Sequence, residues 1–125
     1  MAVKKILIVD DDKEILDLVG KKLVSLGYQV IKASLGKEAV LRAQTYRPDL
    51  ILLDIMLPDI DGAEVLNQLK LDPKTEYIPI LFLSGIVNAP HEPSNQVTVA
   101  GRQFEAIPKP FQFEDLHKKI LELLK

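Results

Sequence analysis

Cysteine and tryptophan are absent from this 125-residue chain, and only three tyrosines and four phenylalanines are present. Without cysteine, disulfides, thiolate metal sites and cysteine nucleophiles are excluded. The only two histidines, His91 and His117, are not expected to bind a metal or to act in catalysis. The N-terminal apolar run covers only residues 6–9, which is too short for a signal-peptide core or a membrane span. We therefore expect a cytoplasmic protein that makes no membrane contact.

The chain also has no large excess of acidic or basic residues. Sixteen basic and eighteen acidic residues give a net charge of -2, so the composition provides no reason to expect direct nucleic-acid binding. The hydrophobic fraction of 47% and the charged fraction of 27% are typical of a globular protein. The length suits one hydrophobic core, and we expect a single domain over residues 1–125.

Short apolar runs alternate with helical patterns along most of the chain. Several of these runs are apolar at every position, as in parallel strands that helices cover on both faces. We predict strands at residues 6–9, 28–33, 50–53, 80–83 and 106–107. Helices are predicted at residues 13–26, 37–46, 62–71 and 113–124, with Asp12 and Asp61 as N-caps of the first and third. This order indicates an α/β fold with a doubly wound, five-stranded parallel sheet.

The segment between Ser84 and Gly101 is a poor match to the expected fourth helix. It contains Pro90 and Pro93, and each interior proline costs about 3 kcal/mol in a helix. We therefore predict a loop with at most a short helix after Pro93, so that the fourth helix is irregular or shortened.

Polar residues follow the predicted strands at their carboxyl ends, which meet at one edge of a doubly wound sheet. Asp10 and Asp11 follow the first strand, Asp54 the third, Ser84 the fourth and Lys109 the fifth. The three carboxylates would raise one another's pKa unless a cation lies between them, and oxygen ligands of this kind suit Mg²⁺. A carboxylate can accept a phosphoryl group, while a lysine and a serine can hold its oxygens.

The chain resembles, over essentially its whole length, the receiver domains of two-component response regulators (the CheY-like superfamily). The matching segments are ILIVDDD at 6–12, DLILLDIMLPDIDG at 49–62, ILFLSG at 80–85 and KPF at 109–111. The resemblance implies a flavodoxin-like strand order 2-1-3-4-5 and a phosphorylation-dependent signalling switch rather than an enzyme. It also implies a sensor histidine kinase or histidine phosphotransfer protein as phosphodonor. The downstream target is left open, and a phosphorylation-linked homodimer is common in the family.

For the metal, the resemblance implies one role for each acidic residue. Asp54 corresponds to the phosphoacceptor and Asp11 to a direct Mg²⁺ ligand. Asp10 corresponds to an acidic neighbour that acts largely through water. Met56 would supply its backbone carbonyl to the metal.

For the phosphoryl group, the resemblance implies that Ser84 provides the switch hydroxyl and that Lys109 contacts a phosphoryl oxygen. Gly85 would leave space for the group. The bond between Lys109 and Pro110 is expected to be cis, an arrangement that proline makes accessible.

Two features depart from the family pattern. The position three residues before Lys109, usually Tyr or Phe, is Ala106, whereas Phe104 lies two residues earlier. We hypothesise that the 86–100 loop orders or shifts on phosphorylation. Apolar Met56 and Ile86 flank the acceptor in the family arrangement, and we predict that they shield the phosphoryl group from water and prolong its lifetime.

Three alternatives belong to other functional classes. A phosphate-independent pseudo-receiver, acting only as a protein-binding module, would be favoured by loss of Asp54 or Lys109, but both are present. A flavin carrier would need a Ser/Thr/Gly-rich loop after the first strand, where this chain has aspartates. A phosphohydrolase would need a proton donor near its nucleophile, and Ile55 and Met56 cannot act as one.

Overall fold

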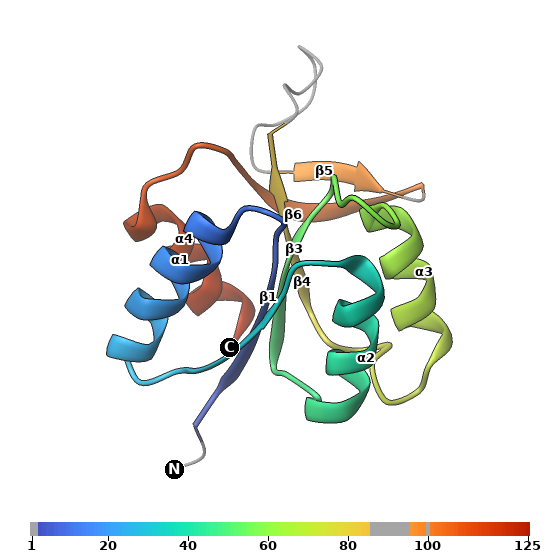
Figure 1. The fold of residues 1–125 in the computed structure, drawn as a ribbon, viewed down its shortest axis with the longest axis horizontal. Helices are drawn as coiled ribbons and strands as arrows, with labels where there is room; N and C mark the ends of the chain where they lie inside the picture. The colour runs from blue at the N-terminus through green and yellow to red at the C-terminus, as the bar shows by residue number, and fades with distance from the viewer. Residues whose placement is uncertain (1–2, 86–95, 100) are drawn as a thin grey trace.

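The computed structural model describes residues 3–85, 96–99 and 101–125 (Figure 1). Along the chain the elements are β1 (Lys5–Val9), α1 (Lys13–Ser25), β2 (Gln29–Ala33), α2 (Gly36–Tyr46), β3 (Leu50–Asp54), α3 (Gly62–Leu71), β4 (Ile80–Ser84), β5 (Gln96–Val99), β6 (Arg102–Pro108) and α4 (Phe113–Leu123). Within the described ranges, no helix is long and apolar enough to cross a membrane.

The strands form one sheet in the order β2-β1-β3-β4-β6-β5. The first five strands in this order pair in parallel, which confirms the doubly wound α/β fold and the predicted order, with β6 as the fifth parallel strand. β5 then pairs antiparallel with β6. The expectation that residues 96–99 belong to a loop was therefore wrong, because they add a sixth strand to the edge. A short helix was also expected after Pro93; residues 94, 95 and 100 lie outside the described residues, and residues 96–99 form a strand instead.

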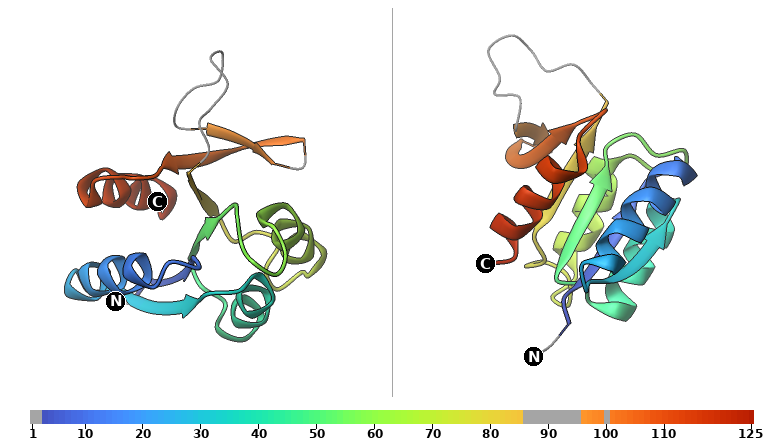
Figure 2. Two further views of the ribbon diagram at one scale, coloured as in Figure 1. Left: turned by 45° about the horizontal axis from the view of Figure 1, so that its top comes forward. Right: turned by 90° about the vertical axis from the view of Figure 1, so that its left-hand side faces the viewer.

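Helices cover both faces of the sheet. Figure 1 shows α1 and α4 on one face and α2 and α3 on the other, and the turned views of Figure 2 show the same layers. Every residue of β3 and β4 is buried, because these central strands lie between two apolar clusters. Continuous apolar runs such as Leu50–Leu53 therefore have core on both sides.

The β5–β6 hairpin belongs to the α2/α3 side of the core. Val99 is buried there, and Val97 and Phe104 pack against the same cluster. The ring of Phe104 meets that of Phe82 edge to face, with centroids 5.4 Å apart. Among the described residues between β4 and β6 no helix is present, and these hairpin side chains supply apolar cover at that end of the sheet.

Helix boundaries follow the capping residues that the sequence indicates. Asp12 and Asp61 precede α1 and α3, and each side chain accepts a hydrogen bond from a backbone N–H in the first turn. After α1, Gly27 adopts a φ of 98°, a left-handed conformation that glycine tolerates without steric cost.

Candidate functional site

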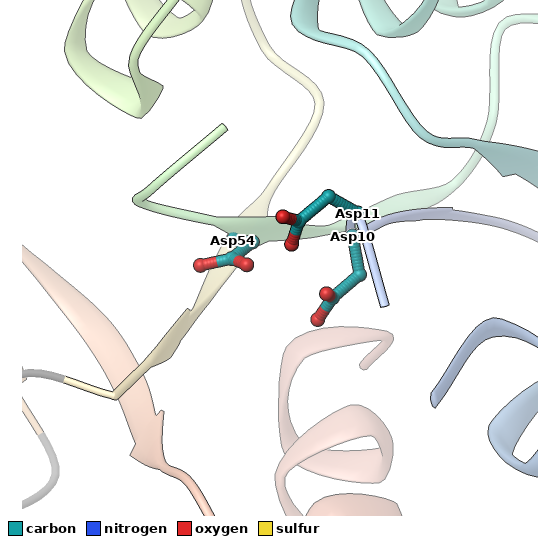
Figure 3. Close-up of side chains that lie close together, drawn as sticks. All are labelled: Asp10, Asp11 and Asp54. Carbon is teal, nitrogen blue, oxygen red and sulfur yellow. The ribbon is translucent and has the colours of Figure 1, made fainter. Parts of the chain in front are cut away.

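The predicted site residues come together at the carboxyl edge of the sheet. Asp10 and Asp11 follow β1, Asp54 ends β3, Ser84 ends β4 and Lys109 follows β6. Figure 3 shows the three carboxylates gathered beside the strand ends. Asp10, Asp11 and Asp54 each offer one oxygen, and these oxygens all lie within 4.8 Å of one another.

Lys109 connects two of these carboxylates. Its Nζ lies 2.7 Å from Oδ2 of Asp10 and 3.0 Å from Oδ2 of Asp54. The Asp10 side chain is fully buried, and the Asp54 and Lys109 side chains are 6% and 19% exposed. Such pairs interact more strongly than surface pairs because little water screens them.

The ionisation of this cluster reflects its burial. Desolvation raises the pKa of Asp10 above its usual value, against the opposing effect of the Lys109 ammonium. Burial alone would lower the pKa of Lys109, but hydrogen bonds and attraction from Asp10 and Asp54 outweigh it and raise that pKa. The proton therefore stays on the lysine, which keeps one positive charge among the acidic groups.

Backbone hydrogen bonds hold the functional groups in place. The N–H of Asp12 donates to Oδ1 of Asp10 at 2.9 Å, and the N–H of Met56 donates to Oδ1 of Asp54 at 3.1 Å. The N–H of Lys109 donates to the carbonyl of Ser84 at 2.7 Å, which fixes Lys109 beside the end of β4. These bonds belong to the ends of regular strands, so the rigid sheet sets the positions of the site residues.

The arrangement of donors fits a hard divalent cation. Two of the three carboxylates are buried, and Oδ2 of Asp10 has no hydrogen-bond partner in the described residues besides its ion pair with Lys109. An oxygen-only group with spare acceptor capacity and one exposed member, Asp11, leaves coordination positions for water or an incoming ligand. The lysine balances only one of the three negative charges.

Other predictions have mixed outcomes. The Lys109–Pro110 bond is cis, as expected. Among the described residues, a Cβ added at Gly85 would meet no atom within 4 Å. Phe104 packs on Phe82, and Ala106 is paired with Phe82 in the neighbouring strand. The aromatic ring that the sequence offers near the missing position is therefore part of the core.

Sequence reasoning did not anticipate two polar contacts. Asp59 accepts hydrogen bonds from the backbone at the start of α2, although it lies in the loop after β3. His117 is half-buried, with its Nε2 3.2 Å from the Tyr28 hydroxyl. His91 lies outside the described residues. Spacing alone could not reveal either contact, because both join residues distant in sequence.

The chain is similar to known proteins in both sequence and structure. The chain is 36% identical to the DNA-binding dual master transcriptional regulator RpaA of Synechocystis over 97% of this chain and 49% of RpaA. The structure of the Vibrio cholerae chemotaxis protein CheY4 is similar with a TM-score of 0.84 and 29% identity, covering 98% of this chain and all of that one.

A second similar structure contains a metal ion. It is the receiver domain of the sensor histidine kinase PA1611 from Pseudomonas aeruginosa, with a magnesium ion coordinated in the active site cleft. It is 26% identical with a TM-score of 0.80, and 98% of each chain is covered. The present chain spans about a fifth to a half of the length of the curated relatives it matches. The family model of the response regulator receiver domain matches residues 6–121, and the chain belongs to this family.

Proposed function

We propose that this receiver domain is a phosphorylation-dependent switch in which Asp54 accepts a phosphoryl group with the help of Mg²⁺. The observation that carries the proposal is the buried cluster at the strand ends, where Lys109 contacts both Asp10 and Asp54 and three carboxylates share one small space. The receiver domain of PA1611 coordinates a magnesium ion in its active site cleft, which supports the choice of metal.

Asp10, Asp11 and Asp54 would hold the metal, together with the backbone carbonyl of Met56. When bound there, Mg²⁺ supplies positive charge that neutralises the phosphoryl oxygens. Burial disfavours three negative charges at this edge, so a divalent cation is the natural counter-charge for the cluster.

In the transfer step, an oxygen of Asp54 forms a bond to the phosphorus of a phosphohistidine on the donor protein. The bond from phosphorus to the donor imidazole breaks, and the imidazole nitrogen keeps the electron pair and takes up a proton from water. Lys109 and the Ser84 hydroxyl bind phosphoryl oxygens. Because the folded site already positions these two donors, they stabilise the negative charge on the phosphoryl oxygens. The protein therefore assists its own modification, and the dephosphorylated donor protein leaves.

The donor we propose is a sensor histidine kinase or a histidine phosphotransfer protein, acting in the cytoplasm. For the output, matched relatives include a DNA-binding regulator, so the expectation of no nucleic-acid involvement has no support from the comparisons. Because the chain spans only part of such relatives, control of an attached or separate output partner remains a proposal, as does phosphorylation-linked dimerisation.

The lifetime of the phosphoryl group is a further part of the proposal. The Met56 side chain is 64% exposed next to the acceptor and cannot activate a water molecule. Ile86, the second flanking residue, lies outside the described residues. We expect slow loss of phosphate, and Met56→Asn should shorten its half-life in a radiolabel or mass assay.

The test is the intact mass of the protein after incubation with acetyl phosphate and Mg²⁺. One phosphoryl addition is expected, absent in Asp54→Asn and absent when EDTA removes the metal. Asp72→Asn, at the C-cap position of α3, where the carboxylate accepts a hydrogen bond from the Lys74 N–H, is the matched control and should label normally. If the wild type does not label while a known receiver does, the phosphate-independent binding module becomes the better interpretation.

A further inference from the structure

The loop that follows the proposed phosphoacceptor is tied to a helix from another part of the chain. We call residues 55–61, between β3 and α3, the acceptor loop. Within it, Oδ1 of Asp59 accepts a hydrogen bond from the backbone N–H of Gly36 at 2.8 Å, and Oδ2 accepts one from Lys37 at 3.0 Å. One carboxylate thus serves two of the unpaired N–H groups that begin α2.

This helix has no cap of its own. Its N-cap residue, Leu35, makes no side-chain hydrogen bond, whereas α1 and α3 are capped by the aspartates that immediately precede them. Hydrogen bonds from Lys37 foremost, and then from Gly36, lower the pKa of Asp59 to about 2 despite opposing desolvation. Asp59 is therefore ionised at neutral pH and placed where the helix dipole favours a negative charge.

The contact between the acceptor loop and α2 is also close-packed. A Cβ added at Gly36 would lie 2.5 Å from Cγ1 of Ile60 and 2.8 Å from Cγ2 of Val65. Glycine at this position therefore lets Ile60 rest directly on the first turn of α2. The polar contact of Asp59 and the apolar contact of Ile60 therefore both fasten the acceptor loop to the first turn of α2.

At its other end, the acceptor loop is held at the site. The N–H of Met56 donates to Oδ1 of Asp54 at 3.1 Å, and the N–H of Gly62 donates to the carbonyl of Ile55 at 2.8 Å. Between these fixed ends lies the peptide group whose carbonyl is assigned to the metal. Asp59 restricts the path of the chain only three residues beyond Met56.

We propose that Asp59 is a positioning residue of the metal site, which sets the position of the Met56 carbonyl by anchoring the acceptor loop to α2. This inference rests on the proposed function, because it requires Mg²⁺ at the carboxylate cluster. Coupling of this kind is reciprocal, so metal binding should in turn stabilise the start of α2. The competing interpretation is that Asp59 stabilises α2 as a cap and has no influence on the metal.

A double variant separates these interpretations. Asp59→Ala removes the anchor and the cap together. Leu35 is exposed and has extended backbone angles (φ −128°, ψ 149°), so Leu35→Asp can place a new cap on α2 without restoring the link to the loop. The set is the wild type, D59A, L35D and D59A/L35D, each titrated with Mg²⁺ by calorimetry and unfolded with urea.

We expect D59A to bind Mg²⁺ about tenfold more weakly, the lower end of the effect of removing a group that orients a metal ligand. In D59A/L35D, resistance to urea should return towards the wild type, while Mg²⁺ binding stays about tenfold weaker. L35D alone should bind Mg²⁺ like the wild type. Amide hydrogen exchange at Gly36 and Lys37 should slow when Mg²⁺ is added to the wild type and stay unchanged in D59A/L35D.

Two other outcomes would overturn the inference in distinguishable ways. Wild-type Mg²⁺ affinity in the double variant would show that Asp59 is a cap alone, with the proposed function intact. Absence of saturable Mg²⁺ binding by the wild type would remove the metal site itself, and the positioning role with it.

Discussion

Replacing Lys109 by methionine tests the electrostatic account of the site most directly. The substitution keeps an unbranched apolar stem but removes the ammonium that lies 2.7 Å from Asp10 and 3.0 Å from Asp54. Without Mg²⁺, the two carboxylates then face each other with no cation. We expect Lys109→Met to lower the free energy of unfolding in EDTA and to lose much of this deficit when Mg²⁺ is added.

The magnitude follows from the geometry. Two unit charges at the 4.8 Å limit for the carboxylate oxygens repel by about 3.5 kcal/mol at an effective dielectric constant of 20. Removing one partner of a buried ion pair costs about 3–5 kcal/mol. Since 19% of the Lys109 side chain is exposed, the lower end applies, and we expect a loss of about 3 kcal/mol.

Urea unfolding monitored by circular dichroism, with EDTA and with saturating Mg²⁺, measures both values. Lys119→Met is the matched control, because the Lys119 side chain is 20% exposed, like that of Lys109, but its ion-pair partners Glu105 and Glu122 are 36% and 52% exposed rather than buried. That variant should lose less than about 1 kcal/mol, with no response to Mg²⁺. Equal stability of Lys109→Met and the wild type in EDTA, or a deficit that Mg²⁺ leaves unchanged, would refute the reasoning.

Three further substitutions or titrations have defined outcomes. The carboxyl carbon of Asp59 should titrate with a midpoint of about 2 in an NMR pH series. Because that pKa is depressed, the stability advantage of the wild type over D59A should be full above about pH 4 and shrink as the pH falls towards 2; an advantage independent of pH would contradict this. Gly62→Ala would place a Cβ 3.0 Å from the Cα of Ile55, so urea unfolding should show a loss of about 1–3 kcal/mol, and a neutral result would mean that the loop yields easily. Phe82→Ala should cost about 3–5 kcal/mol in the same assay, because Phe82 is fully buried; a loss below about 1 kcal/mol would indicate that the core collapses into the space.

The parallel part of the fold was predictable because its signals are local. Strands such as Leu50–Leu53 are apolar at every position, and Asp12 and Asp61 cap the helices that follow them. Apolar spacing alone does not identify the buried face of a helix. Leu18 in α1 and its C-cap residue Leu26 follow the apolar spacing of that segment, yet they are 60% and 50% exposed, because the buried side of α1 is centred on Leu16, Val19 and Leu23.

The added strand was not predicted, although its sequence contains a signal. Val97, Thr98 and Val99 are β-branched, a composition typical of strands, and Gly101 has the positive φ (77°) of a turn residue. The nearby prolines ruled out a regular helix without indicating a strand. Pairing with β6 depends on residues in another segment, and no local pattern specifies that partner.

The members of the candidate site were predictable as residues, but their mutual contacts were not. Strand ends in a doubly wound sheet must converge, and this rule identified Asp10, Asp54 and Lys109. The rule does not say that Lys109 contacts both carboxylates, nor that Asp59 reaches the start of α2. Such contacts depend on loop paths and side-chain rotamers. These are set by tertiary packing and cannot be predicted from local sequence patterns.

The hairpin at the edge of the sheet also has a consequence for folding. Each parallel pair joins segments separated by a helix or a long connection, whereas Val99 pairs with Arg102 almost directly along the chain. Closing so short a loop costs little entropy, and hairpins form in about 1–10 μs. A two-stranded unit is only marginally stable alone, so β5 should form early, open often and become persistent only after Phe104 packs on Phe82. Local opening of β5 therefore needs less free energy than global unfolding, and its amides should exchange faster than those of β3.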